Sequence, residues 1–134
     1  MATPDDMIQK IEALAERDTR YKKEAYFFLY AALDHTVRIL GRHHYATERE
    51  RHVTGRELLR GISEYGWIQY GPMTKAVFAH WGITETLDFG EMVFALVEMG
   101  LMNKTDKDSL EDFREVYDFD KEFDRTARRG TIDL

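Results

Sequence analysis

The chain has no cysteine, only two prolines and no long run of apolar residues. Without cysteine, disulfides, thiolate metal ligands and a thiol nucleophile are all excluded. A membrane-spanning helix needs roughly 18 consecutive apolar residues, and no stretch of this chain approaches that length. The first ten residues contain two acids and no apolar segment, so we expect no secretory signal. These absences predict a cytoplasmic protein without membrane contact.

Common signatures of catalysis and phosphate binding are also missing. Neither GxGxxG nor GxxxxGKS/T occurs in the chain, so the familiar glycine-rich phosphate loops are absent. The only serines, Ser63 and Ser109, do not stand in a GxSxG sequence, which is the pattern of a nucleophilic serine in many hydrolases. We therefore expect a protein that is not an enzyme and that needs no cofactor.

The chain does contain enough apolar material for one core. Of its 134 residues 43% are hydrophobic, 13% are aromatic and 33% are charged. A chain of this length usually forms one domain. We therefore expect residues 1–134 to form a single domain that is mainly α-helical.

Local patterns divide the domain into parts. Apolar residues at helical spacing, a capping pattern at Thr3 and a glycine at position 41 predict an N-terminal helical hairpin over residues 1–41. Residues 42–53 are polar and are expected to form a loop. The next segment, residues 54–102, contains both tryptophans and begins with a capping box at Thr54. It is expected to form three helices joined by tight turns.

The spacing changes after residue 102. Phe113, Glu115, Tyr117 and Phe119 lie at every second position, a period typical of a β-strand. A small β-hairpin with residues 101–105 as its other arm is therefore expected. The stretch SLEDFREVY also fits a continued helix. The sequence therefore allows either a hairpin or a helix over residues 103–119. The tail, residues 120–134, has little apolar content and is expected to fray.

The order of helix, short helix, helix and charged hairpin resembles a winged-helix unit over residues 54–119. The expected fold is thus mainly α with an α+β margin, a helical hairpin packed on a winged-helix-like three-helix unit with a small β-hairpin. The phrases RHVTGRELLRGI, YGPMTKAVFAHWGI and DFGEMVFALVEMGLMNKT also resemble a family of small, uncharacterised bacterial proteins, from Arg17 through Phe119. This second resemblance implies a compact domain and supplies no activity.

The net charge of −6 arises from the second half of the chain, because the first half is nearly neutral. Residues 61–134 contain 8 basic and 15 acidic residues, which makes a poor surface for nucleic-acid phosphates. The helix that would read DNA, residues 88–101, has three acids and no lysine or arginine, although base readout uses arginine, lysine, asparagine or glutamine. We therefore predict a non-enzymatic protein–protein interaction module that docks a basic partner or a second copy of itself.

Two sets of residues are assigned to these functions. The aromatic and acidic residues predicted to bind a protein partner are Trp67, Tyr70, Asp112, Glu115 and Asp118. For the aromatic residues, the competing interpretation is that they pack in the core. The alternative function, binding of RNA or DNA phosphates, is assigned to a basic patch made of Arg42, Arg49, Arg51, Arg56 and Arg60.

Three histidines in the polar segment are weak candidates for metal ligands. His43, His44 and His52 carry imidazoles, which suit zinc and related ions. Their spacing matches no familiar zinc site, and the HExxH pattern is absent. The expectation is a solvated loop without a metal.

Overall fold

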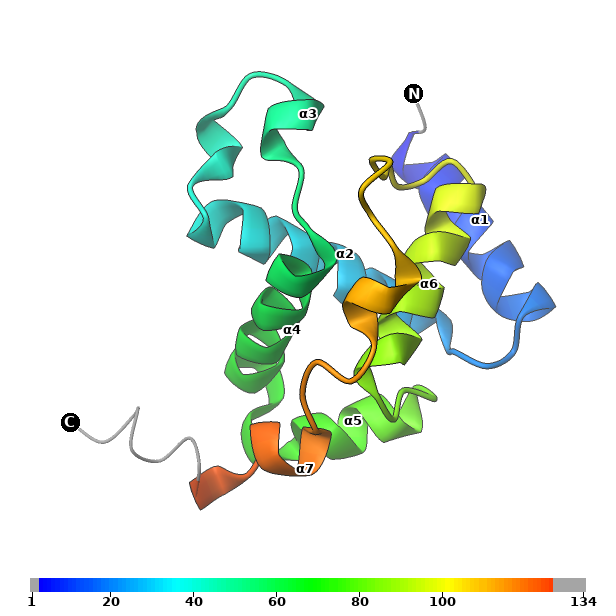
Figure 1. The fold of residues 1–134 in the computed structure, drawn as a ribbon. Coiled ribbons are helices and arrows are strands. Elements are labelled where there is room, and N and C mark those ends of the chain that lie inside the picture. Colours follow the sequence, from blue (N-terminus) through cyan, green and yellow to red (C-terminus); the bar gives the residue numbers. More distant parts are fainter. Residues whose placement is uncertain (1–2, 127–134) are drawn as a thin grey trace.

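The computed structural model describes residues 3–126, and within that range it consists of helices and loops without a β-strand (Figure 1). The longer helices are α1 (Pro4–Arg17), α2 (Lys23–Ile39), α4 (Gly55–Tyr70), α5 (Thr74–His80) and α6 (Thr86–Glu98). The short helical turns are η1 (Arg42–His44), α3 (Glu48–Arg51), η2 (Gly71–Met73), η3 (Leu110–Phe113) and α7 (Phe119–Glu122). The predicted mainly helical fold is confirmed.

Threonine caps set the start of several helices. The hydroxyls of Thr3, Thr47 and Thr54 each accept a hydrogen bond from the backbone N–H three residues on. An acidic side chain at that position accepts from the backbone of the cap in return, which completes a capping box. The starts predicted at Thr3 and Thr54 are confirmed. The cap at Thr47 forms α3, so the segment predicted to be a loop contains two short helical turns, η1 and α3.

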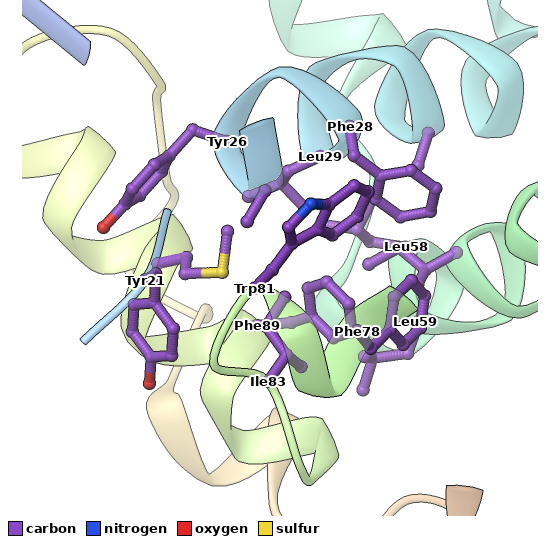
Figure 2. Close-up of a cluster of buried hydrophobic side chains, with 14 of the residues drawn as sticks. Tyr21, Tyr26, Phe28, Leu29, Leu58, Leu59, Phe78, Trp81, Ile83 and Phe89 are labelled. Atoms are coloured by element: carbon purple, nitrogen blue, oxygen red, sulfur yellow. The ribbon is translucent and has the colours of Figure 1, made fainter. Parts of the chain in front are cut away.

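The core is built from aromatic rings of α2, α4, α5 and α6. The Phe28 ring lies 5.3 Å from the Phe78 ring and 5.4 Å from the Trp81 ring, measured between centroids. Figure 2 shows Trp81 in the middle of this cluster, with Phe28 and Phe78 beside it. Phe78 and Phe89 are fully buried, and Trp81 is 8% exposed. The Phe28 and Phe78 rings meet at 68°, and such an edge-to-face pair gains attraction beyond the burial of its area.

The predicted β-hairpin is wrong, and a continued helix is wrong too. In the described range, residues 101–118 run as loops around the single turn η3, and Phe119 begins α7. The reason lies in Thr86 at the start of α6, whose hydroxyl donates to the Phe113 carbonyl at 2.6 Å and accepts from the Val116 N–H at 3.1 Å. These backbone groups are tied to a helix and are unavailable to a strand ladder.

The winged-helix arrangement is not seen in residues 3–126, which contain no wing. The helix that would read DNA in a winged-helix unit corresponds to α6, which places Phe89, Met92 and Leu96 in the core, each 0% exposed. The protein-docking prediction relied on an exposed acidic helix at this place. That part of its reasoning is therefore lost, although the docking function stays a prediction.

The chain also continues to pack where fraying was expected. Phe119 and Phe123, at the start and just past the end of α7, are each 4% exposed. An ion pair between Lys75 and Asp120 ties α7 to α5, and a hydrogen bond from Ser63 to Glu122 ties it to α4. The prediction of fraying is wrong for residues 120–123, and for residues 127–134 it lies outside the described residues.

Candidate functional site

A hollow of about 290 Å³ opens beside α2, and we call it the α2 groove. Its apolar lining consists of Tyr30, Leu33, Val37, Val53, Leu58, Val93, Phe94, Leu101, Met102 and Phe113. Its polar lining consists of Glu48, Arg51, His52, Asn103, Lys104 and Asp108. A concave, mainly apolar wall with a few convergent polar groups is typical of ligand sites, whose volumes begin near 300 Å³.

The apolar wall follows from helical spacing. Tyr30, Leu33 and Val37 recur three and four positions apart, so they share one face of α2. The core takes up the other side of this helix, and these three side chains stay half-buried. They also line an adjoining hollow together with Asp34, so the groove continues along the helix.

The loop that follows α6 forms the opposite side of the groove. Gly100 has a φ of 75°, a left-handed conformation that suits glycine and ends the helix. The next residue is held in place because the Tyr30 hydroxyl donates to the Leu101 carbonyl at 2.5 Å. Burial raises the pKa of Tyr30 to about 12. Asn103 further along donates to Glu48 of α3 at 3.2 Å, and Figure 1 shows α3 and this loop at the same end of the molecule.

A histidine and an aspartate meet at the rim of the groove. His52 Nε2 lies 2.9 Å from Asp108 Oδ2, and the two side chains are 24% and 15% exposed. The contact is close but poorly aligned, since this buried nitrogen donates no hydrogen bond within the described residues. Asp108 Oδ2 also accepts the backbone N–H of Thr105 at 2.7 Å. The contact places an imidazole beside a carboxylate at the rim of the groove.

Two cations at the rim have no acidic partner among the described residues. Neither Arg51 nor Lys104 forms an ion pair with another residue in the range 3–126. Arg51 is half-buried and donates one N–H to the Tyr45 carbonyl at 2.6 Å, while Lys104 is exposed. The remaining N–H groups of both side chains are available to an incoming acceptor.

The residues predicted to bind a protein partner are not gathered on one exposed face. Trp67 is half-buried and packs against the core, and the Tyr70 ring lies 5.9 Å from that of Trp81. Asp112 accepts the Ser109 N–H at 3.0 Å, and Asp118 accepts the Asp120 N–H at 2.8 Å. These two carboxylates therefore serve as local caps. The core interpretation of the aromatic residues fits this geometry.

Some acids nevertheless share a second hollow of about 290 Å³. Its wall contains Glu85, Glu115 and Asp118, together with Thr84, Thr86, Tyr117 and Phe119. Glu115 is exposed and has a φ of 47°, the only positive value among the described residues other than glycine. Of the acids on this wall, Glu115 and Asp118 belong to the set predicted to bind a protein partner.

The predicted basic patch is divided by internal contacts. Arg42 Nη1 and Nη2 donate to the two oxygens of Glu57, each at 2.8 Å, and Nη1 also donates to the His52 carbonyl at 2.8 Å. The hydrogen bonds from Arg42 lower the pKa of Glu57 and raise that of Arg42. Arg51 lines the α2 groove, and the exposed members of the patch are Arg49, Arg56 and Arg60. This division weighs against phosphate binding by the patch as a unit.

The three candidate histidines lie apart. His43 and His44 belong to η1, where their ring centroids are 3.9 Å apart. Their side chains therefore do not diverge as neighbours in an extended loop would. His52 contacts Asp108 instead. No group of three or more histidine and acidic side chains in residues 3–126 is arranged to hold a metal ion.

Asp108 and Lys104 were missed by the sequence reasoning as site residues. They belong to a different segment from Arg51 and His52, and no local spacing connects the two segments.

Comparison of the chain with protein-family models, curated proteins and solved structures found no match. The resemblance to a family of small bacterial proteins therefore stays a prediction. In the part of the chain that is described, no helix combines the length and hydropathy needed to cross a bilayer.

Proposed function

We propose that this protein is a non-enzymatic binding protein, and that the α2 groove takes up the apolar part of a small amphipathic molecule. The observation that carries the proposal is the composition of the groove wall. Leu58 and Phe113 at its base are 5% and 3% exposed, while the face of α2 and Val93 of α6 stay half-buried. Covering apolar surface of this kind contributes about 25 cal/mol for each Å² removed from water.

The way the wall is held together favours a small molecule. Segments far apart in the chain meet at the groove, and the hydrogen bonds from Tyr30 to Leu101 and from Asn103 to Glu48 join them across it. A site assembled before its ligand arrives loses less conformational freedom on binding. The volume of about 290 Å³ also suits one compact ligand or one alkyl chain.

The polar lining supports binding more than covalent catalysis. The groove is lined by no serine or threonine among the described residues, and its one hydroxyl, that of Tyr30, is engaged with the Leu101 carbonyl. His52 and Asp108 could move a proton, but this lining offers them no hydroxyl nucleophile to activate.

A neutral fluorescent probe, N-phenyl-1-naphthylamine, tests the proposal. Its fluorescence is expected to rise on titration into the protein, with a dissociation constant in the micromolar range. Val93→Trp fills the groove and is expected to abolish the rise. The matched control is Ile68→Trp, because Ile68 is 59% exposed on α4 and does not line the groove. Thermal melts establish that both variants fold. Equal binding by wild type and Val93→Trp, or no binding by wild type, would overturn the proposal.

Docking of a basic protein is a second candidate, and the hollow with Glu85, Glu115 and Asp118 on its wall favours it. A lysine or arginine of the partner would enter there. A labelled lysine-rich peptide should bind at low salt with a measurable rise in anisotropy, and Glu85→Gln with Glu115→Gln should remove the rise. Unchanged binding by the double variant would contradict this candidate. Self-docking predicts a dimer mass by light scattering.

A further inference from the structure

We infer that the ligand of the α2 groove carries a carboxylate head, as a medium-chain fatty acid does, and that Arg51 and Lys104 receive it. This inference rests on the proposed function, since it adds the chemistry of the head to an apolar chain already placed in the groove. The starting observation is position. The polar lining residues come from α3, the α3–α4 junction and the loop after α6, whereas α2 and α6 supply apolar ones.

The acids at the rim already have donors. Asp108 Oδ2 lies 2.9 Å from His52 Nε2 and accepts the Thr105 N–H at 2.7 Å. Glu48 Oε2 accepts from the Asn103 amide at 3.2 Å. A cationic head group would have to compete with these donors, or donate only to the carboxylate oxygens that are not already engaged. The rim is therefore poorly prepared for an ammonium group.

The cations at the rim are prepared for an anion. Arg51 uses one of its N–H groups on the Tyr45 carbonyl, which fixes the side chain without neutralising it. Its planar guanidinium can donate two parallel hydrogen bonds to the oxygens of a carboxylate. Lys104 adds a second positive charge to the same lining from the loop after α6, although its exposure makes it the weaker contributor.

The backbone around Arg51 supports this role. The residue ends α3, whose first turn is fixed by the capping box between Thr47 and Glu50. Arg51 also lines the adjoining hollow beside α2, so this residue belongs to both hollows. A chain lying in the groove would bring its head group to this place.

Calorimetric titration with three ligands of equal chain length separates the head from the chain: decanoate, 1-decanol and decylammonium, each kept below its aggregation concentration. Decanoate is expected to bind about tenfold more tightly than decanol, which corresponds to about 1.4 kcal/mol. Decylammonium is expected to bind more weakly than decanol. Arg51→Gln should bring decanoate to the level of decanol, and Lys104→Gln should lower its affinity by a smaller factor.

Arg60→Gln is the matched control, because Arg60 is an exposed arginine of α4 that does not line the groove. It is expected to leave the preference for decanoate unchanged. Equal binding of decanoate and decanol would overturn the carboxylate inference and leave the proposed function standing. The carboxylate inference also fails if the Arg51→Gln, Lys104→Gln double variant keeps the preference. If none of the three ligands binds, both the inference and the proposed function fail.

Discussion

Gly61 of α4 faces Thr36 of α2 so closely that a methyl group added at Gly61 would lie 1.7 Å from the Thr36 hydroxyl oxygen. Thr36 is 2% exposed, and its hydroxyl donates to the Ala32 carbonyl of its own helix at 2.7 Å. Because Thr36 is buried and hydrogen-bonded, its side chain cannot move away from position 61. The absence of a side chain at position 61 therefore lets α2 and α4 approach, and the aromatic core beside them depends on that approach.

Gly61→Ala is expected to lower the free energy of unfolding by about 3 kcal/mol, because overpacking a tight contact forces the helices apart. Thr36→Ala removes the atom that would be struck first. The double variant should therefore be more stable than the sum of the two single losses predicts. Urea unfolding of the four proteins measures this coupling. Simple additivity would show that the two residues do not limit the helix separation.

Glu57→Gln tests the ion pair with Arg42 while keeping the capping box, since glutamine can also accept the Thr54 N–H. The expected loss near pH 7 is about 2 kcal/mol, in the range for hydrogen bonds to charged groups. Arg42 lowers the pKa of Glu57. The ion pair therefore stabilises the protein at pH values above the ordinary pKa of a glutamate, and this stabilisation is lost as the pH falls through the lowered pKa. The difference from wild type should thus shrink in acid. Chemical unfolding at several pH values measures it, and a constant difference would refute the assignment.

Tyr30 and Tyr26 form a natural comparison. The Tyr30 hydroxyl donates to the Leu101 carbonyl, whereas the buried Tyr26 hydroxyl has no hydrogen-bond partner among the described residues. Tyr30→Phe is expected to cost about 1 kcal/mol. Tyr26→Phe should be neutral or slightly stabilising, because it removes a buried polar group that gains nothing in return. Urea unfolding near pH 7 gives both values, and a larger loss for Tyr26→Phe would contradict this account.

The same two tyrosines predict a response to alkali. Burial raises the pKa of each to about 12 in the folded protein. Below about pH 10, the ordinary pKa of tyrosine, both hydroxyls are neutral and their contribution to stability is complete. That stability is lost as the pH rises from about 10 toward 12. The wild type should therefore lose more stability over this interval than the Tyr26→Phe, Tyr30→Phe double variant. Equal losses would show that neither hydroxyl resists ionisation.

Phe113 is expected to hold the loop after α6 against the helices. Methyl groups added at Gly55 or Gly90 would each lie 2.8 Å from its side chain, so both glycines make room for this ring. Phe113→Ala should cost about 4 kcal/mol and speed hydrogen exchange in residues 101–112. Met73→Ala is the control, since Met73 is 60% exposed. Unchanged exchange in Phe113→Ala would mean that the ring does not anchor the loop.

Several helix ends were predicted correctly because neighbouring residues decide them, although the similar capping box at Thr47 was missed. The caps at Thr3 and Thr54 and the glycine stop at Gly41, which has a positive φ, depend on local contacts. The hydrogen bonds and backbone angles involved span only a few residues, so their signal is written in consecutive positions.

The path of residues 101–119 and the α2 groove could not be predicted in this way. The alternation from Phe113 to Phe119 favours a strand locally, but the Thr86 hydroxyl and the space left by Gly90 hold this stretch against α6. Likewise, Arg51 and Lys104 meet at one rim only because α3 and the loop after α6 fold toward each other. The sequence alone was enough for the helical class and for the helix ends at Thr3, Gly41 and Thr54, which depend on contacts a few residues apart. Tertiary packing decided the loop and the site, because both depend on surfaces that first meet when the helices close around the core.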